Sequence, residues 1–132
     1  MLLPLNAAAA RAQSLNYHLA FAVCRSGSGK QDNFNQLTLV MYLTWLLQQR
    51  GYGALPVERY QAAEQGIESA FVRANDCGTW ELTSEAAVSF EAILALHDSQ
   101  LSIVPVHLIK SAEQVLMRVV AGEIPPPIPE AS

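Results

Sequence analysis

A glycine-rich loop that ends in a lysine is the first segment of this sequence with residue types suited to chemistry. Gly29 and Lys30 are followed by Gln31, whereas a phosphate-binding P-loop needs a serine or threonine there to hold magnesium. The position of the first P-loop glycine is occupied by Cys24. We therefore expect a flexible interhelical loop, in which Arg25 and Lys30 are candidate contacts for a small anion.

The three histidines are spread singly along the chain, at His18, His97 and His107. His97 and Asp98 form the pair found in HD-type phosphohydrolases, but that metal site also needs a later aspartate and Asp98 is the last one. No Glu-x-x-His pair is present, so the sequence gives no support for a carboxylate-bridged di-iron site. His97 falls on an apolar helical stripe and is expected to be a core or boundary residue.

Carboxylates and cysteines give no stronger signal for catalysis. Glu64 and Glu68 lie four residues apart, where a hard cation could bind, but a solvated helix face is the favoured interpretation. Cys24 and Cys77 are isolated, without a C-x-x-C motif, and are expected to be free thiols. We expect no catalytic residue, no metal site and no cofactor.

A small-ligand binder or minor enzyme remains an alternative to a non-enzymatic protein. Its pocket would lie near Trp80, Glu81 and His97, although the sequence alone does not bring these residues together.

Apolar residues recur at helical spacing along nearly the whole chain, which predicts an all-α fold of about five helices. The first two helices are expected at about 6–23 and 33–50, the third from Pro56, the fourth after Thr83 or Ser84, and the fifth from Pro105 to about 121. Together they make a single helical domain, 1–123. The remaining residues, 124–132, are proline-rich and predict a flexible extended tail.

The predicted helices differ in how their apolar residues are arranged. In the first, one stripe is expected to face the core: Leu5, Ala8, Ala12, Leu15, Leu19 and Ala22. The second is apolar on all sides, which predicts a central and buried helix. In the third, Gly66 is expected to weaken the helix by about 1 kcal/mol relative to alanine.

Length and charge exclude several classes of protein. The chain has 132 residues, 15% of them charged, and a net charge of −4, whereas an average domain carries about 25% charged residues. Residues 1–50 carry a net +3 and residues 51–132 a net −7. This composition is too apolar for a disordered chain and too acidic for a dedicated nucleic-acid binder.

Two apolar segments of the chain have some features of membrane or targeting signals. The charge-free stretch 34–49 is shorter than the roughly 20 residues of a membrane span and contains asparagine and glutamine, so a buried helix is expected and no membrane contact. Residues 1–12 lack the positive start and continuous apolar core of a secretory signal. The expected location is therefore the cytoplasm.

The sequence therefore predicts a small non-enzymatic interaction or regulatory protein. We expect it to form a homodimer and to bind an unidentified protein partner, as an adaptor, accessory factor or chaperone-like protein. The candidate interface is the polar and aromatic edge of the second helix, formed by Tyr42, Trp45, Gln48 and Gln49. A DNA-associated regulator that uses the basic N-terminal half is a further alternative.

Overall fold

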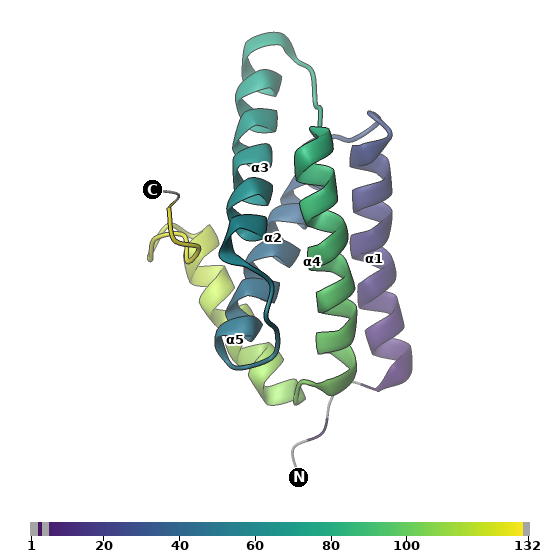
Figure 1. Ribbon diagram of the computed structural model, residues 1–132, viewed down its shortest axis with the longest axis vertical. Helices are drawn as coiled ribbons and strands as arrows, with labels where there is room; N and C mark the ends of the chain where they lie inside the picture. The colour runs from purple at the N-terminus through teal and green to yellow at the C-terminus, as the bar shows by residue number, and fades with distance from the viewer. Residues whose placement is uncertain (1–2, 4–5, 131–132) are drawn as a thin grey trace.

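The computed structural model describes residues 3 and 6–130 and shows an all-helical protein (Figure 1). The five helices are α1 (Ala7–Arg25), α2 (Gln31–Gln49), α3 (Val57–Cys77), α4 (Ser84–Ile103) and α5 (Val106–Val120). These bounds confirm the predicted fold class and each of the five predicted helices. Pro4 and Leu5, on which part of the sequence interpretation rests, and the last two tail residues lie outside the described residues.

Local sequence signals fix the ends of the helices. The side chain of Asn6 accepts a hydrogen bond from the backbone N–H of Ala9 at the start of α1, and Thr83 does the same for Ala86 at the start of α4. Gly78 ends α3 with a φ of 70°, a left-handed conformation that glycine adopts without steric cost. α2 begins two residues earlier than expected, and the Asn33 side chain accepts from the backbone N–H of Lys30.

α2 lies at the centre of the molecule, as its apolar sequence predicts. Among the described helices it alone contacts all four others, whereas α5 packs only on α2. Its residues Leu37, Leu43 and Leu47 are fully buried. The fold is therefore organised by the packing of the other four helices around α2. Within residues 3 and 6–130, no helix is both long and apolar enough to cross a membrane.

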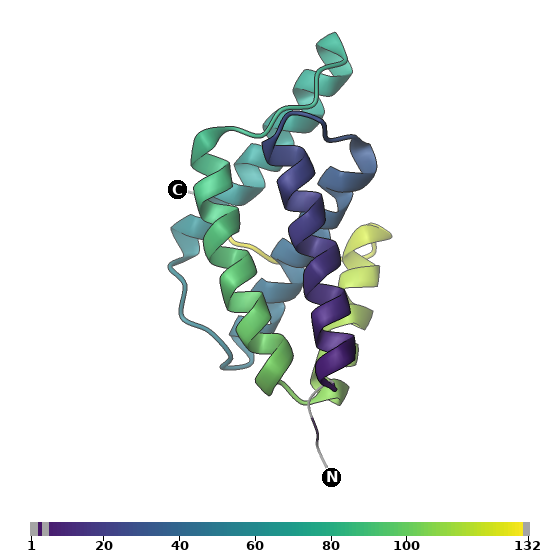
Figure 2. The ribbon, with the colours of Figure 1, turned by 90° about the vertical axis from the view of Figure 1, so that its right-hand side faces the viewer.

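α1 lies on the outside of the bundle, beside α4 and with no helix in front of it (Figure 2). The residues that it buries are Ala20, Phe21 and Cys24. The stripe predicted to face the core points the other way: its described members Ala8, Ala12, Leu15, Leu19 and Ala22 are all exposed. That prediction was wrong because α1 has two apolar faces, and periodicity alone favours the one richer in leucine.

α3 and α4 approach each other closely at Gly66. A β-carbon at this position would lie 2.3 Å from the β-carbon of Ala86 on α4. Gly66 therefore serves the packing of two helices, and the local weakness expected from helix propensity is offset by that close contact.

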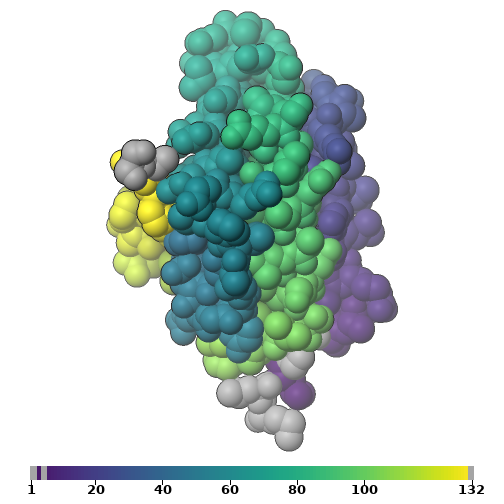
Figure 3. Space-filling model, viewed as in Figure 1, coloured from purple at the N-terminus to yellow at the C-terminus, as the bar shows by residue number. Residues whose placement is uncertain are grey.

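The proline-rich tail packs on the helices, although its composition predicts a flexible end. Ile128 is only 4% exposed and belongs to the hydrophobic core. The Gln61 side chain on α3 donates a hydrogen bond to the backbone carbonyl of Pro129 at 3.0 Å. Figure 3 shows the tail, in yellow, lying beside α3. A single apolar residue among the prolines thus anchors the end of the described chain.

Candidate functional site

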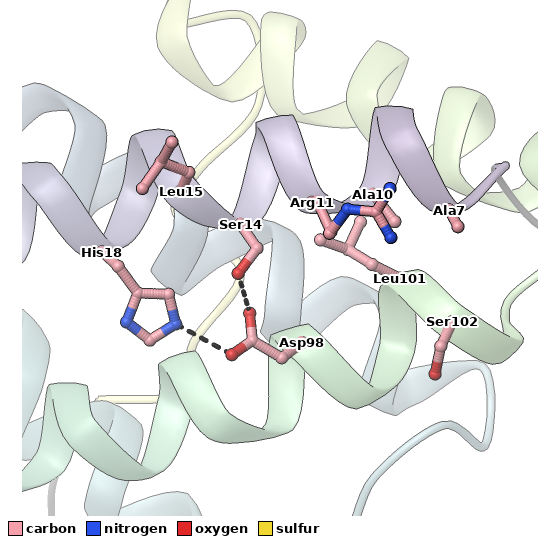
Figure 4. Close-up of a pocket in the computed structure, with 9 residues that line it drawn as sticks. All are labelled: Ala7, Ala10, Arg11, Ser14, Leu15, His18, Asp98, Leu101 and Ser102. Carbon is pink, nitrogen blue, oxygen red and sulfur yellow. Dashed lines mark hydrogen bonds and ion pairs between the residues drawn. The ribbon is translucent and has the colours of Figure 1, made fainter.

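A groove of about 620 Å³ runs between α1 and α4 (Figure 4). The N-terminal two-thirds of α1 forms one wall and the C-terminal end of α4 forms the other. Most of its surface is apolar, and its lining residues are Ala7, Ala10, Arg11, Ser14, Leu15, His18, Asp98, Leu101 and Ser102. Its volume exceeds that of three other surface hollows among the described residues, which measure about 340, 310 and 520 Å³.

Two polar side chains of α1 meet the Asp98 carboxylate in this groove. Ser14 Oγ donates a hydrogen bond to Asp98 Oδ1 at 2.5 Å, and His18 Nε2 lies 2.8 Å from Asp98 Oδ2. Ser14 and His18 are one helical turn apart on α1, so both reach the same carboxylate on α4. Figure 4 shows the two side chains converging on Asp98, while Leu15 points away from it.

The order of these three groups does not favour nucleophilic catalysis. A serine nucleophile needs an imidazole within hydrogen-bond reach of its hydroxyl, with the carboxylate behind the imidazole. Here the carboxylate lies in the middle and holds both the hydroxyl and the imidazole. The arrangement joins α1 to α4 and fixes the direction of the Asp98 carboxylate in the groove.

Sequence reasoning missed this cluster. Along the chain, Asp98 lies 84 residues from Ser14 and 80 residues from His18. The available signal was the one-turn spacing of Ser14 and His18 on a single helix, but their partner could only come from the packing of α1 on α4.

The outward face of α1 continues from this groove. Leu15, which also lines the groove, is 56% exposed, and Leu19 is 54% exposed. We call the five exposed residues Ala8, Ala12, Leu15, Leu19 and Ala22 the α1 stripe. They are three or four residues apart and carry no polar group, so they form one apolar band about 21 Å long.

The predicted interface on α2 lies mostly inside the molecule. Tyr42 and Trp45 are each 9% exposed, because α3 covers this edge. The Trp45 ring packs edge-to-face on Tyr60, with 5.0 Å between centroids. Gln48 accepts hydrogen bonds from the Tyr60 hydroxyl and from a loop N–H, and of the four predicted residues only Gln49 is exposed. The edge is therefore a contact within the chain.

Tyr42 is tied to a carboxylate of α3. Its hydroxyl donates to Glu64 Oε2 at 2.5 Å. Burial raises the pKa of Glu64, as do the nearby Glu68 and Glu130, while the hydrogen bond from Tyr42 opposes the rise. Glu64 and Glu68 thus lie beside the tail and the α2–α3 contact.

The two basic residues expected to contact an anion are placed differently from each other. Arg25 forms an ion pair with Glu91 on α4, at 2.5 Å, and its guanidinium lies over the Phe21 ring. Lys30 is exposed at the start of α2. Arg25 therefore already has an acidic partner, whereas Lys30 forms no ion pair among the described residues.

The structure does not bring Trp80, Glu81 and His97 together. Trp80 packs between Phe34 and Phe71 in the loop before α4, and Glu81 pairs with Arg73. His97 lies thirteen residues after Ser84, the first residue of α4, which corresponds to about 20 Å along the helix axis. The predicted pocket would need these three residues to converge, and the length of α4 separates His97 from the other two.

His97 is a buried member of a hydrogen-bond network. The Gln100 amide nitrogen donates to the carbonyls of Thr44 and Tyr52, so its oxygen must accept from His97 Nδ1, 3.1 Å away. His97 Nε2 is then an unprotonated acceptor, and within the described chain it has no partner. Burial lowers the pKa of this imidazole, which keeps it neutral.

The two cysteines are both free, as expected. Cys24 is buried, and burial raises the pKa of its thiol to about 11. Cys77 is exposed near the end of α3. A thiol with a raised pKa is a poor nucleophile at neutral pH, so Cys24 contributes packing.

Comparisons with protein-family models, with curated proteins and with solved structures give no match to this chain.

Proposed function

We propose that this protein is a non-enzymatic helical interaction protein that docks an apolar helix on the outside of α1. The docking surface consists of the α1 stripe and the adjoining groove with Asp98. The helix would come from a second copy of the chain or from a protein partner, as expected of an adaptor, accessory factor or chaperone-like protein.

The observation that carries this proposal is the exposure of Leu15 and Leu19 on a helix face without polar groups. Single exposed apolar residues are common on protein surfaces, but a continuous band is typical of an interaction site. The pair on α5, Met117 and Val120, is also exposed, but Lys110, Glu113 and Gln114 share that face of the helix. The spacing of the α1 stripe fits helix-in-groove recognition, in which anchors recur every three or four residues.

A photo-crosslinking amino acid placed at Leu19 tests the proposal in cells that produce the protein. We expect covalent adducts with a protein at this position, and their loss when Leu15→Glu is added to the same chain. The matched control is the crosslinker at Val72, an exposed apolar residue on α3 (60% exposed). Equal adducts at both positions, or none at Leu19, would contradict the proposal.

The groove itself favours a second candidate, a binder of a small amphipathic ligand. Its volume is in the range of known ligand pockets, and one polar cluster lies in an otherwise apolar lining. Leu19 belongs to the α1 stripe but does not line the groove. An apolar fluorescent probe that binds Leu19→Glu as well as it binds the wild type would favour this function over helix docking.

The sequence also suggested a DNA-binding function and a cytoplasmic location. The DNA-binding alternative relies on the basic N-terminal half, in which Arg25 already pairs with Glu91 of the same chain, so we do not propose it. For the compartment we retain the cytoplasm, a proposal that the two free cysteines support.

A further inference from the structure

The α1 stripe has a nearly symmetric order of residues about Leu15. Ala8 and Ala22 each lie seven residues from it, and Ala12 and Leu19 lie three and four residues from it. If two such stripes met antiparallel about a two-fold axis at Leu15, Ala8 would face the partner's Ala22, and Ala12 would face the partner's Leu19. Each Leu19 would then meet a small residue, which allows two helices to approach closely.

Charges beside the stripe are complementary in the same arrangement. Arg11 and His18 lie on the flank of the stripe that faces α4, and both line the groove. A two-fold axis perpendicular to two antiparallel helices keeps this flank on the same side in both copies. Arg11 would then lie against the partner's His18 and the partner's Asp98.

Asp98 is what makes this contact favourable. α1 has no acidic residue, so two α1 helices alone would offer Arg11 no carboxylate. Asp98 is the one carboxylate among the lining residues of the groove, and Ser14 and His18 hold it in place. Within the described part of the chain, Arg11 forms no ion pair.

We infer that the occupant of this surface is a second copy of the chain. Two α1 helices pack antiparallel about Leu15, and Arg11 of each copy pairs with Asp98 of the other. The inference rests on the proposed docking function and names its partner. A contact of about four helical turns lies in the size class of weak interfaces, so the dimer forms in a concentration-dependent way.

Cysteine crosslinking tests the direction of the two helices. In a Cys77→Ser background, with buried Cys24 left in place, a short bismaleimide should join two chains of Leu15→Cys. Ala8→Cys should crosslink only when mixed with Ala22→Cys, whereas Val72→Cys on α3 should give no product. A parallel pair would instead crosslink Ala8→Cys with itself, and that result would overturn the inference.

A charge exchange tests the ion pair. We expect Arg11→Glu and Asp98→Arg each to weaken the homodimer at least tenfold, because each places like charges opposite one another twice. A mixture of the two variants should form a heterodimer close to wild-type affinity, since both of its charge pairs are then complementary. Sedimentation measures all three, and failure of the mixture to associate would refute the pairing.

The two proposals fail in different ways. Adducts at Leu19 with another protein, together with no crosslinking of Leu15→Cys to itself, would leave the docking function in place and remove the second copy. A small-molecule adduct or no adduct at Leu19 would remove both.

Discussion

His97 combines burial with an unpartnered ring nitrogen, and this makes its protonation a measure of folding. The side chain is 1% exposed, and burial lowers its pKa in the folded state below the ordinary value of 6.5. In the unfolded chain the imidazole binds a proton near pH 6.5, while the folded protein resists it. Its contribution to stability is therefore present above that pH and is lost as the pH falls towards the folded-state pKa.

We predict that His97→Asn flattens the acid side of the stability profile. The free energy of unfolding of the wild type should fall below pH 6.5 by up to about 1.4 kcal/mol per pH unit from this group. Asparagine keeps a donor for Gln100 but does not titrate. Urea unfolding between pH 5 and 8 measures the slopes, with His107→Asn on the exposed face of α5 as the control. An unchanged slope in His97→Asn would show that His97 is not the group responsible.

Gly66 gives a prediction in which packing outweighs helix propensity. Alanine is favoured over glycine in a helix by about 1 kcal/mol, but its β-carbon would lie 2.3 Å from that of Ala86. Overpacking of this kind typically costs about 1–3 kcal/mol. We therefore expect Gly66→Ala to lower the melting temperature, and the double change with Ala86→Gly to restore part of it. Thermal unfolding that shows a more stable Gly66→Ala would contradict the close contact.

At the scale of elements, the tail behaves as part of the fold. Ile128→Ala should reduce the free energy of unfolding by about 2 kcal/mol, the lower end for a buried isoleucine, and lower the melting temperature by about 5–10 °C. Deletion of residues 124–132 should have at least the same effect. Pro126→Ala, at an exposed position, is the control for calorimetry. A tail deletion that leaves the melting temperature unchanged would contradict this account and support the flexible tail predicted from composition.

The elements themselves could be predicted because their signals are local. Proline, glycine and the capping residues Asn6 and Thr83 mark helix ends within a few positions, and a helix that is apolar all round must be covered on all sides. The buried face of a helix was harder to predict than its ends. α1 carries apolar residues on two faces, and only the packing of Phe21 and Cys24 decides which face is buried.

The candidate site depends on contacts between distant parts of the chain. Ser14 and His18 meet Asp98 because α1 packs beside α4, and α3 removes Trp45 from the surface. Neither consequence follows from spacing within one helix. The prediction of an exposed apolar surface was useful, but the sequence placed it on α2 and the structure shows an exposed apolar band on α1.

At the scale of the whole molecule, the low charge content is explained by two different surfaces. α2 needs apolar neighbours on all sides and finds them within the chain, whereas the α1 stripe has none among the described residues. The acidic groups of residues 51–132 lie mainly on α3, α4 and α5, and Asp98 brings one of them to the edge of the stripe.

Sedimentation equilibrium over a wide range of protein concentration tests the central claim most directly. We predict that the wild type rises from 14.4 kDa towards about twice that mass in the micromolar range expected of a weak interface. Leu15→Glu should remain at the monomer mass with an unchanged melting temperature, because Leu15 is exposed in the monomer, and Val72→Glu should still associate. A wild type that stays at 14.4 kDa at every concentration, or that dimerises equally well with Leu15→Glu, would contradict the assembly proposed here.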